Sequence, residues 1–374
     1  MNKIFSLGYF LLLNVVAIMC AHARSPYRPI DPKDPMITVY WQDDPLIKYE
    51  FHESHLQEAM FKLFNKEYLL KRLLPQGPIN FRYNTSKTVT GDTLSALVEE
   101  VIIEIKNLKK RQKKIHFKNF TILKKRDVNK CNHTGLFVLK FKDYPFVLKL
   151  FIETPEGIIH PNDKGFEPIC FYYLSGLSRH FNGGPRIENL ERSQHIIQND
   201  PYWSTRVDFP RKWFWLPKDP RWITIEGKNI GTNKEITTTI PGVYACICDE
   251  IQWERPFTLK NSADRIKAMN LSNRLGQHID SHIENFGEEI DKETNDFEEG
   301  IDLPKNTIPT HKPKKIVPID FEDFITAVGI EENLQCKNYF EWYMHLTRKM
   351  LKRLLFQNKK ERRAAQYKPF KSLI

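Results

Sequence analysis

The sequence predicts an α+β protein in which helical segments precede a region of short strands. Residues 50–74 carry apolar side chains at helical spacing, and a second helical pattern covers residues 92–114, where Asp92 or Thr93 can cap the first turn. From about residue 117 the pattern changes to β-rich runs separated by turn residues. These runs are "NFTILKKR", "GLFVLKFK" and "YPFVLKLFIE".

Further elements follow the β-rich runs. The pattern predicts a helix at 168–181, an ordered loop at 199–222, and strands in "RWITIEG" and "PGVYACICDEI". Residues 262–277 form another helical pattern, which Ser262 can cap. Residues 288–315 are acidic at first and then rich in proline and lysine, a composition that predicts a disordered insertion.

The composition is that of a globular protein with a sizeable core, because 41% of the 374 residues are hydrophobic and 12% are aromatic. The net charge of +11 favours acidic partners in general. This charge is spread along the chain, and no zinc-finger or RNA-binding signature accompanies it. The sequence therefore predicts no specific nucleic-acid partner.

The N-terminus has the anatomy of a cleavable secretory signal. Residues 1–23 contain a lysine near the start, an apolar run, and a small-x-small pattern that ends at Ala23. An uncleaved membrane anchor is the alternative, but the apolar run from Ile4 to Cys20 is short for a membrane span. We expect cleavage after Ala23, a secreted or periplasmic mature protein, and no transmembrane segment after cleavage.

The cysteines predict neither a disulfide framework nor a metal site. Five cysteines remain after the signal, and an odd, sparse set is unlike the cysteine pattern of disulfide-rich domains. They are Cys131, Cys170, Cys246, Cys248 and Cys336. Cys246 and Cys248 lie in an apolar strand-like run, where their side chains would share one face, so we expect them to be packed in the interior.

The stretch "HIDSHIEN" is the main candidate for chemistry, and one interpretation is a metal site. In an extended segment His278, Asp280 and His282 would point to one face and offer three ligands to zinc, as in a zinc-dependent hydrolase. Zinc hydrolases generally draw further ligands from other strands. The other histidines of this chain stand in linker, surface-like or helix-terminal contexts.

The second interpretation is the catalytic loop of a phosphotransferase. Transfer of a γ-phosphoryl group needs an aspartate that orients the acceptor, two metal-binding side chains, and a lysine on the phosphates. Asp280 and Asn285 have the order and spacing of the catalytic aspartate and the metal-binding asparagine. Asp320 directly follows an apolar run in "KKIVPIDFEDF", and Lys149 lies in "FVLKLF", the second strand of a predicted pair.

Taken together, "HIDSHIEN" and "IVPIDFED" resemble the H-x-D-x-H-x-x-N and I-D-(F/W/Y)-(E/D) motifs of kinase-like phosphotransferases. Aminoglycoside and choline kinases have this pairing, and HipA-type and lipid kinases have a related loop. The resemblance covers residues 117–345, and its specific part is two short motifs and one lysine. It implies a two-lobed protein-kinase-like fold with an N-terminal helical extension, and ATP and Mg²⁺ bound between the lobes.

The resemblance also implies a role for each residue of the motifs. Asp280 would be the catalytic aspartate, and Asn285 and Asp320 would bind the metal ions. Lys149 would contact the phosphates of ATP. The two histidines of the loop would mostly shape it.

Three further residues would take part in nucleotide binding. Glu167, ahead of "PICFYYLSG", would pair with the phosphate lysine, and Glu250 in "CDEIQW" would lie in the interlobe hinge beside adenine. Gly135 is the single glycine where kinases with a full glycine-rich loop have three. The sequence departs from protein kinases in two other ways, because Pro168 places Glu167 at a helix start and no A-P-E segment follows the last motif.

The resemblance divides the chain into four parts. Residues 1–23 are the signal peptide and residues 24–115 are a linker with a helical extension. Residues 116–250 form the N-lobe, and residues 251–374 form the C-lobe with the insertion at 288–315.

The expected function is that of a secreted, ATP- and Mg²⁺-dependent phosphotransferase whose acceptor is a protein or a small molecule. The first alternative is a catalytically inactive kinase-like module that binds a partner, which the signal peptide favours because ATP is scarce in most extracytoplasmic spaces. A zinc-dependent hydrolase is the second alternative. A fold alone does not decide between these activities.

Overall fold

The computed structural model describes residues 36–52, 66–109, 115–124, 133–156, 185–228, 235–275, 279, 282–290 and 314–321. These residues form a mixed structure of helices and sheets, so the α+β class is confirmed. The predicted signal peptide and the predicted helix at 168–181 lie outside the described residues. Within the described ranges, none of the helices combines the length and apolar character needed to span a bilayer.

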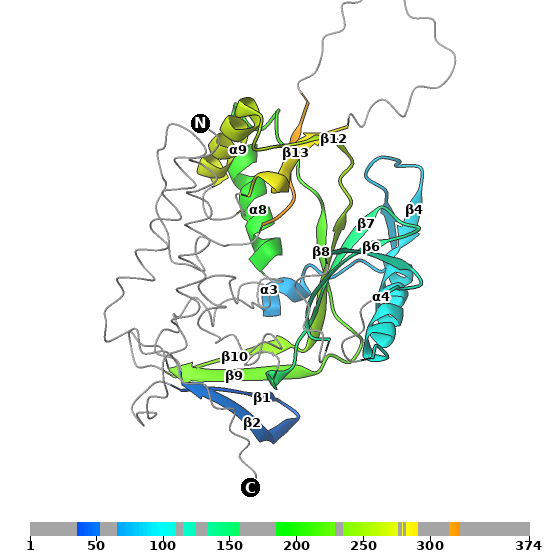
Figure 1. Cartoon of the computed structure of the whole chain (residues 1–374), viewed down its shortest axis with the longest axis vertical. Helices are drawn as coiled ribbons and strands as arrows, with labels where there is room; N and C mark the ends of the chain where they lie inside the picture. Colours follow the sequence, from blue (N-terminus) through cyan, green and yellow to red (C-terminus); the bar gives the residue numbers. More distant parts are fainter. Residues whose placement is uncertain are drawn as a thin grey trace, which may run out of the picture.

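A five-stranded antiparallel sheet lies at the centre of the described structure, with strand order β5-β6-β7-β11-β8 (Figure 1). Its strands are β5 (Phe120–Lys124), β6 (Gly135–Phe141), β7 (Phe146–Ile152), β8 (Lys212–Trp215) and β11 (Val243–Asp249). The first three strands and β11 match the predicted β-rich runs. In contrast, β8 lies inside the predicted loop at 199–222.

Helix α4 (Gly91–Lys106) covers one face of this sheet (Figure 1). Its N-cap is Thr90, whose Oγ1 accepts the N–H of Thr93 at 3.2 Å, and not Asp92 or Thr93 as predicted. The helix ends at Lys106, earlier than the predicted 114. Its buried side chains are Leu94, Val98, Val101, Ile102 and Ile105. Each such side chain contributes about 1.5–3 kcal/mol when it leaves water.

A four-stranded antiparallel sheet packs near the other face of the central sheet, with order β10-β9-β1-β2. Its strands are β1 (Met36–Trp41), β2 (Asp44–His52), β9 (Trp222–Lys228) and β10 (Glu235–Pro241). Val39, Ile223 and Ile240 from this sheet share a buried cluster with Phe151 and Tyr244 from the central sheet. The sequence pattern does not predict β1, β2 or β10.

The helix predicted over residues 50–74 is wrong at both ends. Residues 50–52 belong to β2, and the described helix α3 (Lys66–Leu70) is only five residues long. Residues 53–65 lie outside the described part of the chain. The N-terminal region is thus not a purely helical extension, since it also contributes β1, β2 and the short hairpin of β3 (Pro78–Asn80) and β4 (Thr88–Thr90).

A separate hydrophobic core lies above the central sheet in Figure 1, between two helices and a three-stranded sheet. Its elements are α8 (Pro185–Gln198), α9 (Ser262–Leu275), the 3-10 turn Ile283–Asn285, β12 (Trp253–Pro256), β13 (Phe286–Glu289) and β14 (Ile316–Pro318). Helix α9 matches a predicted helix, but its first turn is capped by Asn261 and not by Ser262, because Asn261 Oδ1 accepts the N–H of Ala263 at 2.9 Å. Helix α8 was not predicted.

The predicted insertion at 288–315 is wrong at its N-terminal edge. Glu288 and Glu289 form the end of β13, whereas their acidic sequence suggests a solvated tract. Glu288 pairs with Arg255 and Lys267, and Glu289 pairs with Arg82. These partners are distant in sequence, so local composition does not reveal them. Residues 291–313 lie outside the described part.

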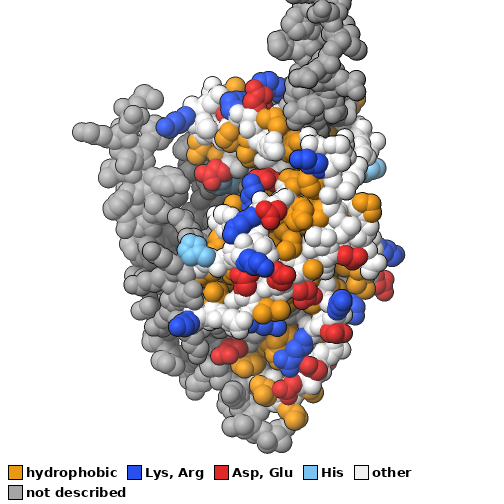
Figure 2. Space-filling view, turned by 90° about the vertical axis from the view of Figure 1, so that its right-hand side faces the viewer, with side chains coloured by type: hydrophobic (Ala, Val, Ile, Leu, Met, Phe, Trp, Pro, Cys, Tyr) orange, Lys and Arg blue, Asp and Glu red, His pale blue; other side chains and the backbone are white. Residues whose placement is uncertain are grey.

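Charged side chains of both signs are intermingled with apolar ones on the face of the molecule that α4 covers (Figure 2). The net charge of +11 is therefore not gathered into one basic patch on the described part of that face.

Candidate functional site

Two lysines and two cysteines share the face of the central sheet that points away from α4. In the pairing of β11 with its neighbours, Cys246 lies opposite Lys149 of β7, and Cys248 lies opposite Lys212 of β8. Side chains alternate between faces along a strand, so Cys246 and Cys248 point the same way and their partners point with them. The strand register thus places both lysines on one face, on either side of β11.

Asp320 follows β14 and reaches this face of the sheet. Lys149 Nζ lies 3.1 Å from Asp320 Oδ2, and Arg186 Nε lies 3.6 Å from Asp320 Oδ1. Burial would raise the pKa of Asp320, but the charges of Lys149, Arg186 and Lys212 outweigh it and hold the pKa well below its usual value. The carboxylate is therefore ionised at neutral pH although it is buried.

Two side chains hold the short segment around Asp320. Lys212 Nζ donates to the carbonyl oxygen of Ile319 at 3.0 Å and lies 4.5 Å from the ring centroid of Phe321. From α8, Asn189 Nδ2 donates to the carbonyl oxygen of Phe321 at 3.1 Å. The backbone is therefore fixed on both sides of Asp320. A lysine of the central sheet holds the residue before it, and an asparagine of α8 holds the residue after it.

Three basic side chains lie around the carboxylate of Asp320. They are Lys149, Arg186 and Lys212, and the charge of each lowers the pKa of Asp320. Burial, together with the charge of Lys149, lowers the pKa of Lys212 to about 8. Perturbed pKa values of buried ionisable groups cluster at functional sites, although structural ion-pair networks also produce them.

The two cysteines add no charge to the site. Cys246 and Cys248 are free and buried, as the sequence predicts. Burial raises the pKa of the Cys246 thiol to about 11, and it also raises the pKa of Cys248. Both side chains are therefore neutral thiols at physiological pH.

Asn285 lies next to Asp320 through backbone pairing. It ends the 3-10 turn before β13, and its carbonyl oxygen accepts the N–H of Ile319 at 3.0 Å. Strands β13 and β14 are antiparallel, with Phe286 opposite Pro318. The start of β13 therefore lies beside the end of β14, so the residue before β13 is close to the residues after β14. The structure thus brings together Lys149, Asn285 and Asp320, which the sequence predicts as one site.

Of the other predicted site residues, the structure describes only Gly135 and Glu250. Asp280, Glu167 and His278 lie outside the described residues. Gly135 begins β6 with φ 109°, a conformation that side chains disfavour, so a glycine is required there. The N–H of Glu250 donates to the carbonyl oxygen of Pro145 at 2.9 Å. Its carboxylate lies 2.5 Å from Nζ of Lys140.

The described residues give no support to a zinc site. Over the described ranges, no three His, Cys, Asp or Glu side chains gather closely enough to hold a metal ion. His282 is exposed and its Nδ1 accepts the N–H of Glu284 at 3.4 Å. The other two members of the proposed ligand set, His278 and Asp280, lie outside the described residues.

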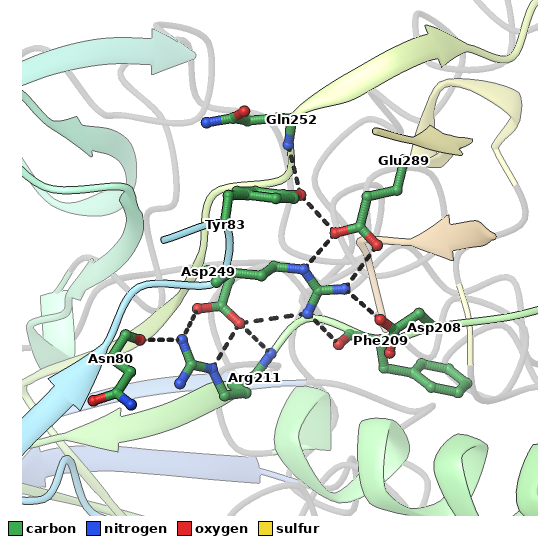
Figure 3. A network of polar contacts seen from close by, with 9 residues as sticks. Asn80, Tyr83, Asp208, Phe209, Arg211, Asp249, Gln252 and Glu289 are labelled. Carbon is green, nitrogen blue, oxygen red and sulfur yellow. Dashed lines mark hydrogen bonds and ion pairs between the residues drawn. The ribbon is translucent and has the colours of Figure 1, made fainter. Parts of the chain in front are cut away.

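A second polar network, built around Arg82, was not anticipated from the sequence (Figure 3). Arg82 Nε and Nη2 donate to the two carboxylate oxygens of Glu289 at 2.5 and 3.0 Å, and Nη2 also donates to Asp208 at 3.0 Å. Arg82 Nη1 donates to the carbonyl oxygen of Phe209 at 2.7 Å and lies 3.6 Å from Asp249. Burial would lower the pKa of Arg82, but these carboxylates raise it above its usual value.

Tyr83 and Arg211 extend this network to the end of β11. The hydroxyl of Tyr83 donates to Glu289 at 2.6 Å and accepts the N–H of Gln252 at 2.9 Å (Figure 3). Arg211 Nη2 pairs with Asp249 at 2.7 Å. The network therefore joins the hairpin of β3 and β4, the segment before β8, the end of β11, and β13. It fixes the central sheet relative to the small three-stranded sheet.

No protein-family model matches the chain, and no curated protein or solved structure matches it either.

Proposed function

We propose that the protein is a secreted, ATP- and Mg²⁺-dependent phosphotransferase with a two-lobed, kinase-like fold. The observation that carries this proposal is the ion pair of Lys149 with Asp320, next to Asn285, in a buried site. In protein kinases a lysine of the third strand contacts the phosphates, and an aspartate and an asparagine hold the metal ions. Lys149 lies on β7, the third strand of the central sheet in chain order.

The arrangement of the cores supports a two-lobed organisation. The central sheet and α4 enclose one core, and α8, α9 and the three-stranded sheet enclose another. Asp249 ends β11 of the first sheet, and Trp253 begins β12 of the second. Asp320 follows a strand of the second sheet and contacts a lysine of the first, so the proposed site lies between the two units.

The residues present fit a magnesium ion. Asp320 Oδ1 is buried and accepts no hydrogen bond within the described structure. The lowered pKa keeps this carboxylate ionised, and carboxylate and amide oxygens are suitable ligands for Mg²⁺. Asp320 and Asn285 would hold the ion, and when bound it would neutralise charge on the phosphates. Lys149 would orient the phosphates, and Asp280 would take up the proton of the acceptor hydroxyl.

Glu250 is not available for the contact with adenine that the sequence suggests. Its N–H and its carboxylate both have protein partners, Pro145 and Lys140. An adenine ring at "CDEIQW" would therefore contact other groups of that segment. The loop ahead of Gly135, which would cover the phosphates, falls at 125–132 outside the described residues.

One observation favours the alternative of an inactive kinase-like binding module. In protein kinases a glutamate from a helix pairs with the phosphate lysine. Here α8 lies in the chain between β7 and β8, and the side chain that it brings to Asp320 is Arg186, not a carboxylate. An altered set of charges is what we expect if phosphoryl transfer is no longer required.

A transfer assay distinguishes the two candidates. The mature chain is incubated with ATP labelled at the γ-phosphate, in MgCl₂ or in EDTA, and both labelled protein and released phosphate are measured. We expect activity that requires Mg²⁺ and that falls about 100-fold or more in Asp320→Asn and in Asp280→Asn. Asp143→Asn changes an exposed carboxylate and is the matched control.

Two results would contradict the proposed activity. Binding of ATP without transfer under any of these conditions would favour the inactive module. Equal activity in Asp320→Asn and in Asp143→Asn would show that the site around Asp320 does not perform the reaction.

A further inference from the structure

Helix α3 and the chain directly after it lie next to both α8 and the edge of the central sheet (Figure 1). Leu69 of α3 is buried in one cluster with Ile187 of α8 and Phe214 of β8. After the helix, the N–H of Leu74 donates to the carbonyl oxygen of Phe214 at 2.7 Å, and the N–H of Phe214 donates to that of Arg72 at 2.8 Å. The segment from α3 to Leu74 is therefore anchored to β8 by main-chain hydrogen bonds.

Two side chains of this anchored segment hold the carboxylate of Glu191, which belongs to α8. Arg72 Nε and Nη2 donate to its two oxygens at 2.5 and 2.7 Å, and the hydroxyl of Tyr68 donates to it as well. The guanidinium group of Arg72 also lies 3.5 Å from the ring centroid of Tyr68. Arg72 and Glu191 are partly exposed, so their pair adds little to global stability, but its bidentate geometry fixes the position of α8 relative to α3.

On a different side, α8 holds the segment that contains Asp320. Asn189 Nδ2 donates to the carbonyl oxygen of Phe321 at 3.1 Å, and Arg186 Nε lies 3.6 Å from Asp320 Oδ1. Residues three apart on a helix are neighbours on its surface, whereas residues two apart do not face each other. Arg186 and Asn189 thus lie on the side of α8 that contacts this segment, and Glu191 projects from another side. Helix α8 therefore connects α3 to the candidate site.

We propose that Arg72 and Glu191 are positioning residues of the candidate site, because they hold α8 where Arg186 and Asn189 fix the segment around Asp320. The expected effect on phosphoryl transfer rests on the proposed function, whereas the effect on the segment does not. The proposal gives a role in the site to part of the region that the sequence assigns to a linker and helical extension.

The physical reason is that a helix moves as one body. Main-chain hydrogen bonds link Glu191 to Asn189 and Arg186 within α8, so a shift of the helix that follows loss of the Arg72 pair also moves those two side chains. Lys212 still holds Ile319, so the segment should loosen and not detach. Catalysis is sensitive to such a change, because a displacement of about 1 Å can lower a rate by about 100-fold.

The first test is hydrogen exchange of the full mature chain, without nucleotide or metal, followed by mass spectrometry of its peptides. In Arg72→Gln and in Glu191→Gln, we expect exchange about fivefold or more faster in peptides covering 185–198 and 314–321, and unchanged exchange in β6 and β7. The double variant should match the single ones, because both side chains act through one contact. Arg192→Gln is the matched control, since it removes an exposed arginine of α8 that pairs with Glu188 on the same helix.

The second test is the transfer assay with ATP and MgCl₂. We expect kcat to fall about tenfold in Arg72→Gln and in Glu191→Gln, because Asp320 is displaced. The KM for ATP should stay within about threefold, because Lys149 is not changed. Arg192→Gln should have the kcat of the wild type. Circular dichroism shows whether each variant is folded.

Each adverse result has a separate meaning. Unchanged exchange at 314–321 in both variants overturns the positioning role, since α8 then does not transmit the change. Equally faster exchange in β6 and β7 also overturns it, because the pair then only stabilises the whole fold. Absence of transfer by the wild type contradicts the proposed function, and the exchange experiment still decides whether Arg72 and Glu191 position the segment around Asp320.

Discussion

Arg82 and Glu289 are 207 residues apart in the chain and form a bidentate ion pair, with N–O distances of 2.5 and 3.0 Å. Arg82 comes from the loop between β3 and β4, and Glu289 ends β13. The pair is almost fully buried, so it connects the N-terminal part of the chain to the sheet that carries Asp320. Its removal should therefore affect the stability of the whole structure.

We expect Arg82→Ala to lower the free energy of unfolding by about 3–5 kcal/mol, because it leaves the buried carboxylate of Glu289 without its main partner. Urea denaturation measures this change. Arg192→Ala removes an exposed pair with Glu188 on one helix and should cost about 0.5 kcal/mol. Equal effects of the two variants would show that the Arg82 network does not stabilise the fold.

Gly287 in β13 leaves room for the ring of Trp253. A Cβ atom at Gly287 would lie 2.5 Å from Cε3 of Trp253, closer than two carbon atoms can approach. We expect Gly287→Ala to lower stability by roughly 1–3 kcal/mol and to reduce the melting temperature. Gly77→Ala is the control, because no atom lies within 4 Å of its added methyl group. A melting temperature of Gly287→Ala equal to that of the control would contradict this packing.

The thiols of Cys246 and Cys248 should resist alkylation in the folded protein. Burial raises the pKa of Cys246 to about 11 and raises that of Cys248 as well, so at pH 8 both are protonated and weakly nucleophilic. Iodoacetamide treatment at pH 8, followed by mass spectrometry of the peptides, measures the labelling. We expect labelling of both residues in urea and almost none without it. Rapid labelling in buffer would mean that this face of β11 is open to solvent.

The carboxylate of Glu288 should make stability depend on pH. Burial would raise the pKa of Glu288, but hydrogen bonds and charge from Lys267 and Arg255 hold it below its usual value. A carboxyl group whose pKa is lowered by folding stabilises the protein above the unfolded pKa of about 4.3, and this contribution is lost as the pH falls through the folded pKa. The wild type should therefore be more stable than Glu288→Gln at pH 7.

The same comparison at lower pH completes this test. The stability difference between wild type and Glu288→Gln should shrink as the pH is lowered below about 4. Urea denaturation at pH 7 and at pH 3.5 measures it. Glu235→Gln, which changes an exposed carboxylate, should not alter stability at either pH. A difference for Glu288→Gln that is constant with pH would contradict the ion pairs with Lys267 and Arg255.

The elements predicted correctly from the sequence are those whose pattern is local. Helix α4 shows its apolar stripe at helical spacing, and β6, β7 and β11 are continuous apolar runs between turn residues. The prediction failed for β1 and β2, which form a hairpin that packs on β9. The apolar residues within 50–74 have helical spacing, so this pattern gave no sign that residues 50–52 belong to β2.

The candidate site shows the same division. The residue types and positions of Lys149, Asn285 and Asp320 in or beside apolar strands predict a common site, and the structure brings these three together. Lys212 gave no such signal, because it begins β8 directly before three aromatic residues, in a stretch that the sequence pattern assigns to a loop. Arg186 stands in a polar helix that does not display a clear apolar stripe.

The sequence alone therefore determined the α+β class, four of the five central strands, and the three residues that lie together in the candidate site. The tertiary structure decided what surrounds them, because strand register and helix packing place Lys212 and Arg186 beside Asp320. It also decided that Arg82 joins two sheets, through a carboxylate that local composition assigns to a disordered insertion. Charge pairs of this kind form between segments remote in sequence, so only the folded chain reveals them.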